Sequence, residues 1–455
     1  MPKPKPRPDW VPFWRYLKLF RADILSAQPE RLYAAWMAAF RTPFFRSFLI
    51  NDPTLVKEVL QDNPEDYPKS SRVNEGLRPL LGNSVFVTNG AVWERQRRII
   101  DPAFEGGRLR DSFPAMQHAA ARTVERLAER GAADAVEVEE QASHAAADVM
   151  FRTLFSIPIQ DETATKVFKA FRTYQRSQPI LNLAAFIPLP HWMPRFHRSE
   201  TVLAAEKIRK LLTQLCDARQ AEIAAGTAPD DLATKIMTTR DPETGELFTT
   251  EEMVDQVAIF FLAGHETSAS ALGWALWLLA AHPDIQERVA AEAASVDPVS
   301  MPFAHLSKLP LTRNVFREAL RLYPPVPMMV RQNTYQREWR DRRIPRGAQI
   351  VLSPWHLHRH ERLWDNPDGF DPDRWDDPAT KDSQRDAYLP FSAGPRVCVG
   401  AGFAMAEGVV LLSAIMASCR VAPIEGQVPE PQAHLTVRAR HGIWLKIMPR
   451  SGQAG

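Results

Sequence analysis

One loop carries a cysteine in an unusual chemical setting. Residues 391–400 read Phe-Ser-Ala-Gly-Pro-Arg-Val-Cys-Val-Gly, and an apolar, helix-compatible run follows. Gly394 and Gly400 allow backbone conformations closed to other residues and let a flat ligand approach the main chain. Arg396 supplies a cation two residues before Cys398, and the next helix start supplies free N–H groups and a partial positive charge. These features favour a thiolate, and a rigidly held thiolate suits an axial metal ligand.

The spacing Phe-x-x-Gly-x-Arg-x-Cys-x-Gly resembles the haem-binding loop of the cytochrome P-450 family. It is formed by Phe391, Gly394, Arg396, Cys398 and Gly400. The resemblance implies that Cys398 is the axial thiolate ligand of the iron of haem b, and that Phe391, Arg396 and Gly400 belong to the same cofactor site.

Two hydrolase patterns are present only in part. Ser392 lies in half of a Gly-x-Ser-x-Gly nucleophile elbow, but Pro390 stands in place of the first glycine. His265 begins a His-Glu-x-x-His zinc-peptidase pattern, but Ala269 stands in place of the second histidine. We therefore expect neither a serine hydrolase nor a zinc site.

A predicted helix places Trp93 and Arg97 four residues apart and hence on one face. They resemble the Trp-x-x-x-Arg pair of the family, whose side chains donate to a haem propionate, and Arg331 resembles a further propionate-binding arginine. The physical reason is that buried carboxylates need cationic or N–H donors. Arg95 and Arg98 point to other faces of the helix, where we expect a redox partner to dock.

Residues 251–281 form a long, nearly all-apolar segment that predicts a buried helix. Its middle, Ala263-Gly264-His265-Glu266-Thr267, resembles the oxygen-binding motif of the family. The resemblance implies that Ala263 and Gly264 leave room for O2. It also implies that Glu266 and Thr267 are the catalytic residues that deliver protons, with Thr267 able to bond back to a helix carbonyl.

Two sets of polar residues lie outside these motifs. The first resembles a buried cluster of the family that locks the haem side of the fold: Glu318, Arg321 and Arg374. The second is an alternating run of histidines that would share one face of a strand and could bind a metal: His356, His358 and His360. We expect these histidines to be partly exposed in a turn-rich segment, and Cys398 to be the only metal ligand.

Most of the sequence is typical of helices, with short strands predicted near residues 43–50, over 328–352 and near the C-terminus. Two apolar segments are expected to cover the substrate, an irregular loop at 70–90 and a Pro-rich segment at 174–196. The family resemblance implies a mainly α fold with a smaller β-rich region, an α-rich triangular prism around a buried haem. Residues 23–455 are expected to form this single catalytic domain.

Composition narrows the class of protein. The net charge of +2 over 455 residues argues against a dedicated nucleic-acid binder. A run of about 20 apolar residues is missing, so we expect no transmembrane segment. Cys216, Cys398 and Cys419 form no disulfide pattern, which suits a reducing, cytoplasmic location.

Residues 1–22 form a Pro-rich, basic N-terminal tail followed by an amphipathic segment. Its apolar residues are Trp10, Phe13, Trp14, Leu17 and Phe20, with Arg15, Lys18 and Arg21 between them. Such a helix could lie in a membrane interface or dock on its own domain, and the sequence leaves both interpretations open.

The family resemblance implies a haem-thiolate monooxygenase that inserts one oxygen atom of O2 into a hydrophobic small molecule. Electrons are expected from separate proteins, a ferredoxin and a ferredoxin reductase. A peroxide-driven peroxygenase is one alternative, although it would not need the Glu266–Thr267 pair. A non-catalytic haem-thiolate sensor is the other. A fatty acid, a terpenoid or a small aromatic compound would each suit the apolar segments as substrate.

Overall fold

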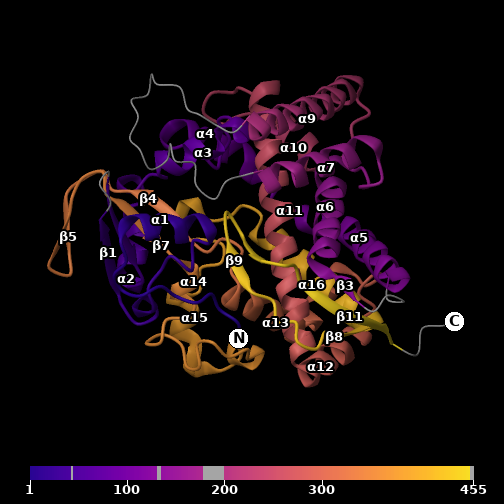
Figure 1. Ribbon diagram of the computed structural model, residues 1–455. Coiled ribbons are helices and arrows are strands. Elements are labelled where there is room, and N and C mark those ends of the chain that lie inside the picture. The colour runs from indigo at the N-terminus through magenta and orange to yellow at the C-terminus, as the bar shows by residue number, and fades with distance from the viewer. Residues whose placement is uncertain (42–44, 131–134, 178–198, 451–455) are drawn as a thin grey trace.

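The computed structural model describes residues 1–41, 45–130, 135–177 and 199–450. Helices make up most of the molecule, and short strands form small sheets beside them (Figure 1). The helices are α1 (Phe13–Ala22), α2 (Pro53–Lys57), α3 (Ser71–Leu81), α4 (Gly90–Ile100), α5 (Arg108–Arg130), α6 (Val138–Phe155), α7 (Glu162–Ser177), α9 (Ser199–Ala225), α10 (Leu232–Thr238), α11 (Thr250–Ala281), α12 (Pro283–Ala294), α13 (Pro310–Leu322), α14 (Pro354–Leu357), α15 (Lys381–Ala387) and α16 (Ala401–Ser418). The mainly α fold with a smaller β-rich region is confirmed.

Short strands lie in the three predicted regions. The strands are β1 (Met37–Arg41), β2 (Arg46–Ile50), β3 (Val136–Glu137), β4 (Met329–Gln332), β5 (Arg337–Trp339), β6 (Arg342–Ile344), β7 (Gln349–Leu352), β8 (Cys419–Pro423), β9 (Pro431–Ala433), β10 (Val437–Ala439) and β11 (Trp444–Pro449). Two of them, β1 and β3, were not predicted. The largest sheet has the order β1-β2-β7-β4, and β2 and β7 run parallel in it. Smaller sheets have the orders β3-β11-β8, β10-β9 and β5-β6.

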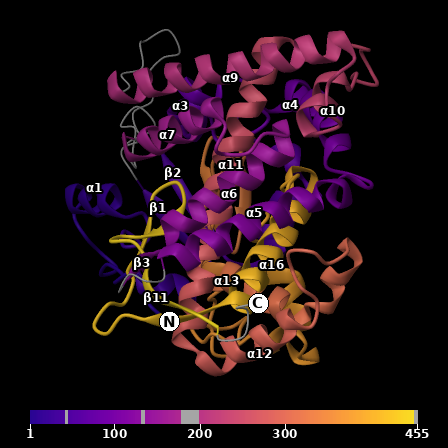
Figure 2. The ribbon, with the colours of Figure 1, turned by 90° about the vertical axis from the view of Figure 1, so that its right-hand side faces the viewer.

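Helix α11 is the central element, and its predicted burial is confirmed. Thr249 and Glu252 form a capping box that starts the helix, because each side chain accepts a hydrogen bond from the backbone N–H of the other. Helix α6 packs along α11, and α9 crosses over it at one end of the molecule (Figure 2). The middle of α11 is thereby fixed on several sides.

The prediction of an irregular loop at residues 70–90 is wrong for its first half. Residues 71–81 form helix α3, although Pro79 lies inside it. Leu80 and Leu81 are fully buried because α3 packs against α9 and α11. Tertiary burial therefore outweighs the low helix propensity of Gly76 and Pro79. The second predicted substrate-covering segment, residues 174–196, lies outside the described residues from 178 onward.

The predicted cluster of Glu318, Arg321 and Arg374 is present and buried. Arg321 Nη2 lies 2.8 Å from Glu318 Oε1, and Arg374 Nε lies 3.0 Å from the same oxygen. The side chains of Glu318 and Arg321 are 0% exposed. The cluster joins α13 to the turn η6 (Pro372–Trp375), so it fixes the long segment that leads toward the cysteine loop.

The expectation of partly exposed histidines is wrong. His356, His358 and His360 lie in α14 and the turn after it, and all three are buried. His358 Nε2 accepts a hydrogen bond from the backbone N–H of Leu389 at 2.8 Å, and burial lowers the pKa of His358 to about 3. The described residues contain no group of three or more His, Cys, Asp or Glu side chains placed to hold a metal ion.

Helix α16 follows the cysteine loop, as predicted. Within the described chain it is the one helix with the length and mean hydropathy, 1.7, of a membrane span. It packs in the core against α5, α11, α12 and α13, and 61% of its residues are buried. This burial is typical of a core helix. Cys216 and Cys419 are also buried.

Candidate active site

The cysteine loop is closed by its own backbone. The Cys398 N–H donates to the carbonyl of Phe391 at 2.9 Å, and the Val397 N–H donates to the carbonyl of Gly394 at 3.0 Å. Gly394 has φ +69°, and a Cβ atom at this position would lie 1.9 Å from the carbonyl oxygen of Leu60. Only glycine fits there. A Cβ at Gly400 would meet no atom within 4 Å, so this glycine borders open space.

The electrostatics of Cys398 differ from the prediction in one respect. Burial raises the pKa of the Cys398 thiol, whereas the N–H of Gly400 and the Arg97 guanidinium lower it. The predicted cation, Arg396, instead donates to the carbonyl of Pro64 at 2.6 Å. Protein atoms surround much of Cys398, but part of the residue remains accessible to solvent. In the ligand-free chain the thiol form is therefore favoured, and a coordinated metal would have to deprotonate it.

A cluster of cations surrounds Trp93 beside this loop. Lys69 Nζ lies 5.7 Å from the centre of the indole ring, and the guanidinium carbons of Arg97 and Arg396 lie 5.7 Å and 5.2 Å from it. Arg97 Nη1 also donates to the carbonyl of Val397 at 3.1 Å, directly before Cys398. The structure thus brings Trp93, Arg97 and Arg396 together, as predicted.

Arg331 of β4 completes the cluster. Its neighbour across an isolated bridge is Lys69, and it is only 7% exposed. Burial and Arg396 lower the pKa of Arg331 to about 10, and burial with the three arginines lowers the pKa of Lys69 to about 6. These lowered pKa values mean that the cations repel one another and that negative charge compensates them poorly.

The cluster fits the carboxylates of a haem. Among the described residues, the Nε atoms of Arg331 and Arg396 are buried and have no hydrogen-bond partner. Buried N–H groups without acceptors are costly, and two carboxylates would supply both negative charge and acceptors. The charge of Arg97 is already compensated in part, because Arg97 pairs with Asp101 at 2.6 Å.

Sequence reasoning missed Lys69. It stands alone between Pro68 and Ser70, without a motif, and only the fold brings it to Trp93. Its ammonium group donates to the carbonyls of Val85 and Thr88, which hold it in place.

Arg95 and Arg98 do not form the free surface that we expected. Arg95 pairs with Glu252 at 2.7 Å, and Arg98 pairs with the buried Asp241 at 2.6 Å. Both side chains instead tie α4 to the segment that leads into α11.

The middle of α11 presents three accessible residues between buried neighbours: Ala263, Gly264 and Thr267. Ala263 is exposed and Thr267 is half-buried. The Thr267 hydroxyl donates to the carbonyl of Ala263 at 2.5 Å, as predicted for back-bonding. Gly264 also has a packing role, because a Cβ there would lie 2.4 Å from Met150 Sδ. Its small size allows α6 to approach α11.

Glu266 is buried and anchored on the side of the C-terminal hairpin. Its carboxylate accepts hydrogen bonds from the Thr436 hydroxyl at 2.6 Å and from Gln175 Nε2 at 3.1 Å. Arg438 Nη2 lies 3.3 Å from the same carboxylate, and the Arg438 side chain is 41% exposed. This network links Glu266 to the protein surface. Thr436, Gln175 and Arg438 were not predicted, since they lie far from α11 in the sequence.

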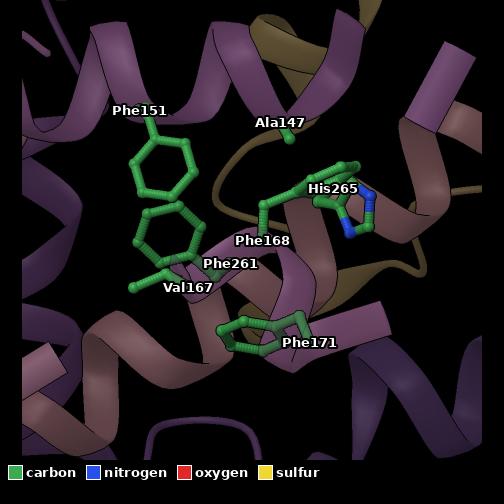
Figure 3. A pocket seen from close by; sticks show the side chains of 7 residues that line it. All are labelled: Ala147, Phe151, Val167, Phe168, Phe171, Phe261 and His265. Carbon is green, nitrogen blue, oxygen red and sulfur yellow. The ribbon is translucent and has the colours of Figure 1, made fainter. Parts of the chain in front are cut away.

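A small apolar pocket lies between α6, α7 and α11 (Figure 3). Its volume is about 10 Å³, which is at most the room of one water molecule. His265 is at its edge and forms a 2.6 Å hydrogen bond with the Ser143 hydroxyl. Burial lowers the pKa of His265 to about 3. His265 is therefore a neutral structural residue.

Comparison with known proteins agrees with this geometry. A family model described as "Cytochrome P450" matches residues 7–447. Cyclooctatin synthase of Streptomyces melanosporofaciens is 33% identical over 84% of this chain and 83% of its own length. Cyclooctat-9-en-7-ol 5-monooxygenase of the same organism is 32% identical over 84% of this chain and 81% of its own length. Cytochrome P450 4F12 of Homo sapiens is 28% identical over 98% of this chain and 89% of its own length.

The chain therefore belongs to the cytochrome P450 family. It is a haem-thiolate monooxygenase, and hence an oxidoreductase that uses O2 and redox partners on a hydrophobic substrate. The fold and the cysteine ligand expected from the resemblance agree with this membership. The named monooxygenase relative disfavours the peroxygenase and sensor alternatives.

Proposed function

We propose that Cys398 is the axial thiolate of a haem b whose propionates lie among Lys69, Trp93, Arg97, Arg331 and Arg396. The observation that carries this proposal is the group of poorly compensated cations, buried or half-buried, directly beside the cysteine loop. When bound, the haem supplies the activation of O2 and the oxidation of substrate. The open space at Gly400 supports close approach of the flat macrocycle, and we assign Phe391 to the edge of the same site.

On the opposite side of the site, we assign Ala263 to the O2 pocket because it is the exposed small residue of a buried helix. Thr267 would hold water and pass a proton from its hydroxyl, which now donates to the carbonyl of Ala263. Glu266 would supply that proton after exchanging it with solvent along the Thr436 and Arg438 network. The apolar interior excludes water elsewhere, which limits side reactions.

A hydrophobic ring compound or a fatty acid is the proposed substrate class. Support comes from the apolar residues that border the site and from the relative named for cyclooctat-9-en-7-ol. A binding titration with compounds of both kinds would test this assignment. A good substrate should shift the absorption of the haem-loaded protein, and no shift with either kind would reject the class.

A ferredoxin with its reductase is the proposed electron source, in the cytoplasm. The three free cysteines support a reducing compartment. We would measure product formation with several ferredoxin systems and, separately, with peroxide. Turnover with a ferredoxin is the expected result. Turnover with peroxide alone would reject this electron source and favour a peroxygenase.

A further inference from the structure

Helix α1 lies at the outer edge of the molecule, beside the β1–β2 hairpin (Figure 2). None of its residues is buried. It is nevertheless attached to the domain, because Gln432 Nε2 donates to the carbonyl of Ala22 at 2.6 Å. The Arg7 guanidinium lies 5.7 Å from the ring centre of Tyr16 in α1 and 6.0 Å from that of Phe40 in β1. The helix is thus held by one side only.

Two highly exposed tryptophans lie at the start of α1 and just before it. Trp10 and Trp14 are each 79% exposed. Within α1, Lys18 and Arg21 share a face with Trp14, since spacings of four and three residues lie on one helix face. Trp10 precedes the helix. Phe13, the aromatic residue beside Trp14, is half-buried instead. This exposed surface therefore joins amphipathic aromatic rings to long cationic side chains.

This side of the molecule has an excess of positive charge. Helix α1 contains Arg15, Lys18 and Arg21 but no acidic residue. In the neighbouring hairpin, the exposed Arg41 and Arg46 are directly opposite each other, and like charges so placed destabilise a strand pair. No ion pair with a described carboxylate involves any of these five cations. The arrangement suits an external anionic surface.

We propose that this surface binds an anionic lipid bilayer, with α1 lying in the plane of the interface. The docking face consists of Trp10, Trp14, Arg15, Lys18, Arg21, Arg41 and Arg46. Indole rings favour the level of the lipid head groups, and Lys and Arg reach anionic phosphates from apolar surroundings. A protein partner is the competing occupant, because Trp and Arg are also enriched at protein interfaces. Binding to protein-free vesicles distinguishes the two.

The test is flotation of the full-length protein with vesicles of phosphatidylglycerol and phosphatidylcholine, compared with phosphatidylcholine alone. Removal of residues 1–22 is unsuitable because Arg7 is buried and bonded to the domain. We would use Trp10→Ala/Trp14→Ala and Lys18→Glu/Arg21→Glu. The matched control is Trp444→Ala/Lys446→Glu on the remote, exposed face of β11. Circular dichroism would check that each variant is folded.

Wild type and control should float with the anionic vesicles and much less with phosphatidylcholine. Each docking-face variant should lose about tenfold in vesicle partition, and added salt should weaken wild-type binding. The proposal is overturned if wild-type protein stays below the vesicles at all lipid concentrations. It is also overturned if the variants float like wild type, or if Trp10→Ala/Trp14→Ala abolishes only self-association.

Discussion

Lys69 is the residue with the largest electrostatic conflict in the proposed haem site. Burial, Arg331, Arg396 and Arg97 lower its pKa from 10.5 to about 6. Between these values, the folded apoprotein binds fewer protons at this lysine than the unfolded chain does. The free energy of unfolding should therefore rise with pH across this window. Two bound carboxylates would oppose the shift, so the effect belongs to the haem-free protein.

Replacing Lys69 with Met should reduce this pH dependence between about pH 6 and 10.5. Urea midpoints of the apoprotein at several pH values would measure it. The same change at the exposed Lys446 of β11 serves as control and should leave the slope as in wild type. An unaltered slope in Lys69→Met would show that Lys69 is not the buried cation described here.

Arg438 is the residue through which Glu266 reaches solvent in the structure. Arg438→Gln should lower the fraction of electrons recovered in product by up to about tenfold, because proton transfer through Glu266 becomes slower. The solvent deuterium isotope effect on turnover should rise with it, and Arg438→Lys should restore both. Equal coupling and equal isotope effects in wild type and Arg438→Gln would argue against this role.

At the scale of elements, two glycines of the cysteine loop have different tasks. Gly394→Ala should lower the free energy of unfolding of the apoprotein by about 2 kcal/mol or more, because of its positive φ and the contact with Leu60. Gly400→Ala meets no protein atom. It should leave this free energy nearly unchanged but weaken haem binding. Urea denaturation and a haem titration measure the two effects, and the opposite pattern would contradict the assignment.

Sequence periodicity predicted some elements well for a clear reason. The buried helix over 251–281 and the helix after residue 400 are long and almost entirely apolar, so few other structures suit them. Within the predicted loop at residues 70–90, the helix at 71–81 was missed because Gly76 and Pro79 are poor helix formers. The burial that stabilises α3 comes from α9 and α11, which sequence spacing alone does not reveal.

At the scale of the whole molecule, the Glu318 cluster connects segments that are distant along the chain. Glu318→Gln leaves Arg321 and Arg374 buried without a carboxylate, so the free energy of unfolding should fall by about 3–5 kcal/mol. Arg288→Gln, which breaks an exposed pair with Asp373, is the control and should have little effect. Similar denaturation midpoints for both variants would rule out a structural role for the cluster.

The site shows what motifs can and cannot predict. Trp93, Arg97, Arg331 and Arg396 were found because each belongs to a recognisable pattern, and the fold gathers them as expected. Lys69 and the partners of Glu266 belong to no pattern, and their placement depends on how distant segments pack. The packing role of Gly264 was missed because its neighbour, Met150, comes from another helix.

The central claim is that Cys398 ligates the haem iron as a thiolate. The absorption spectrum of the reduced, carbon-monoxide-bound protein tests it most directly. The wild-type protein should give the strongly red-shifted Soret band of thiolate-ligated haem, and Cys398→Ser should lose that band. A wild-type band at the ordinary position, or a red-shifted band that persists in Cys398→Ser, would contradict the claim.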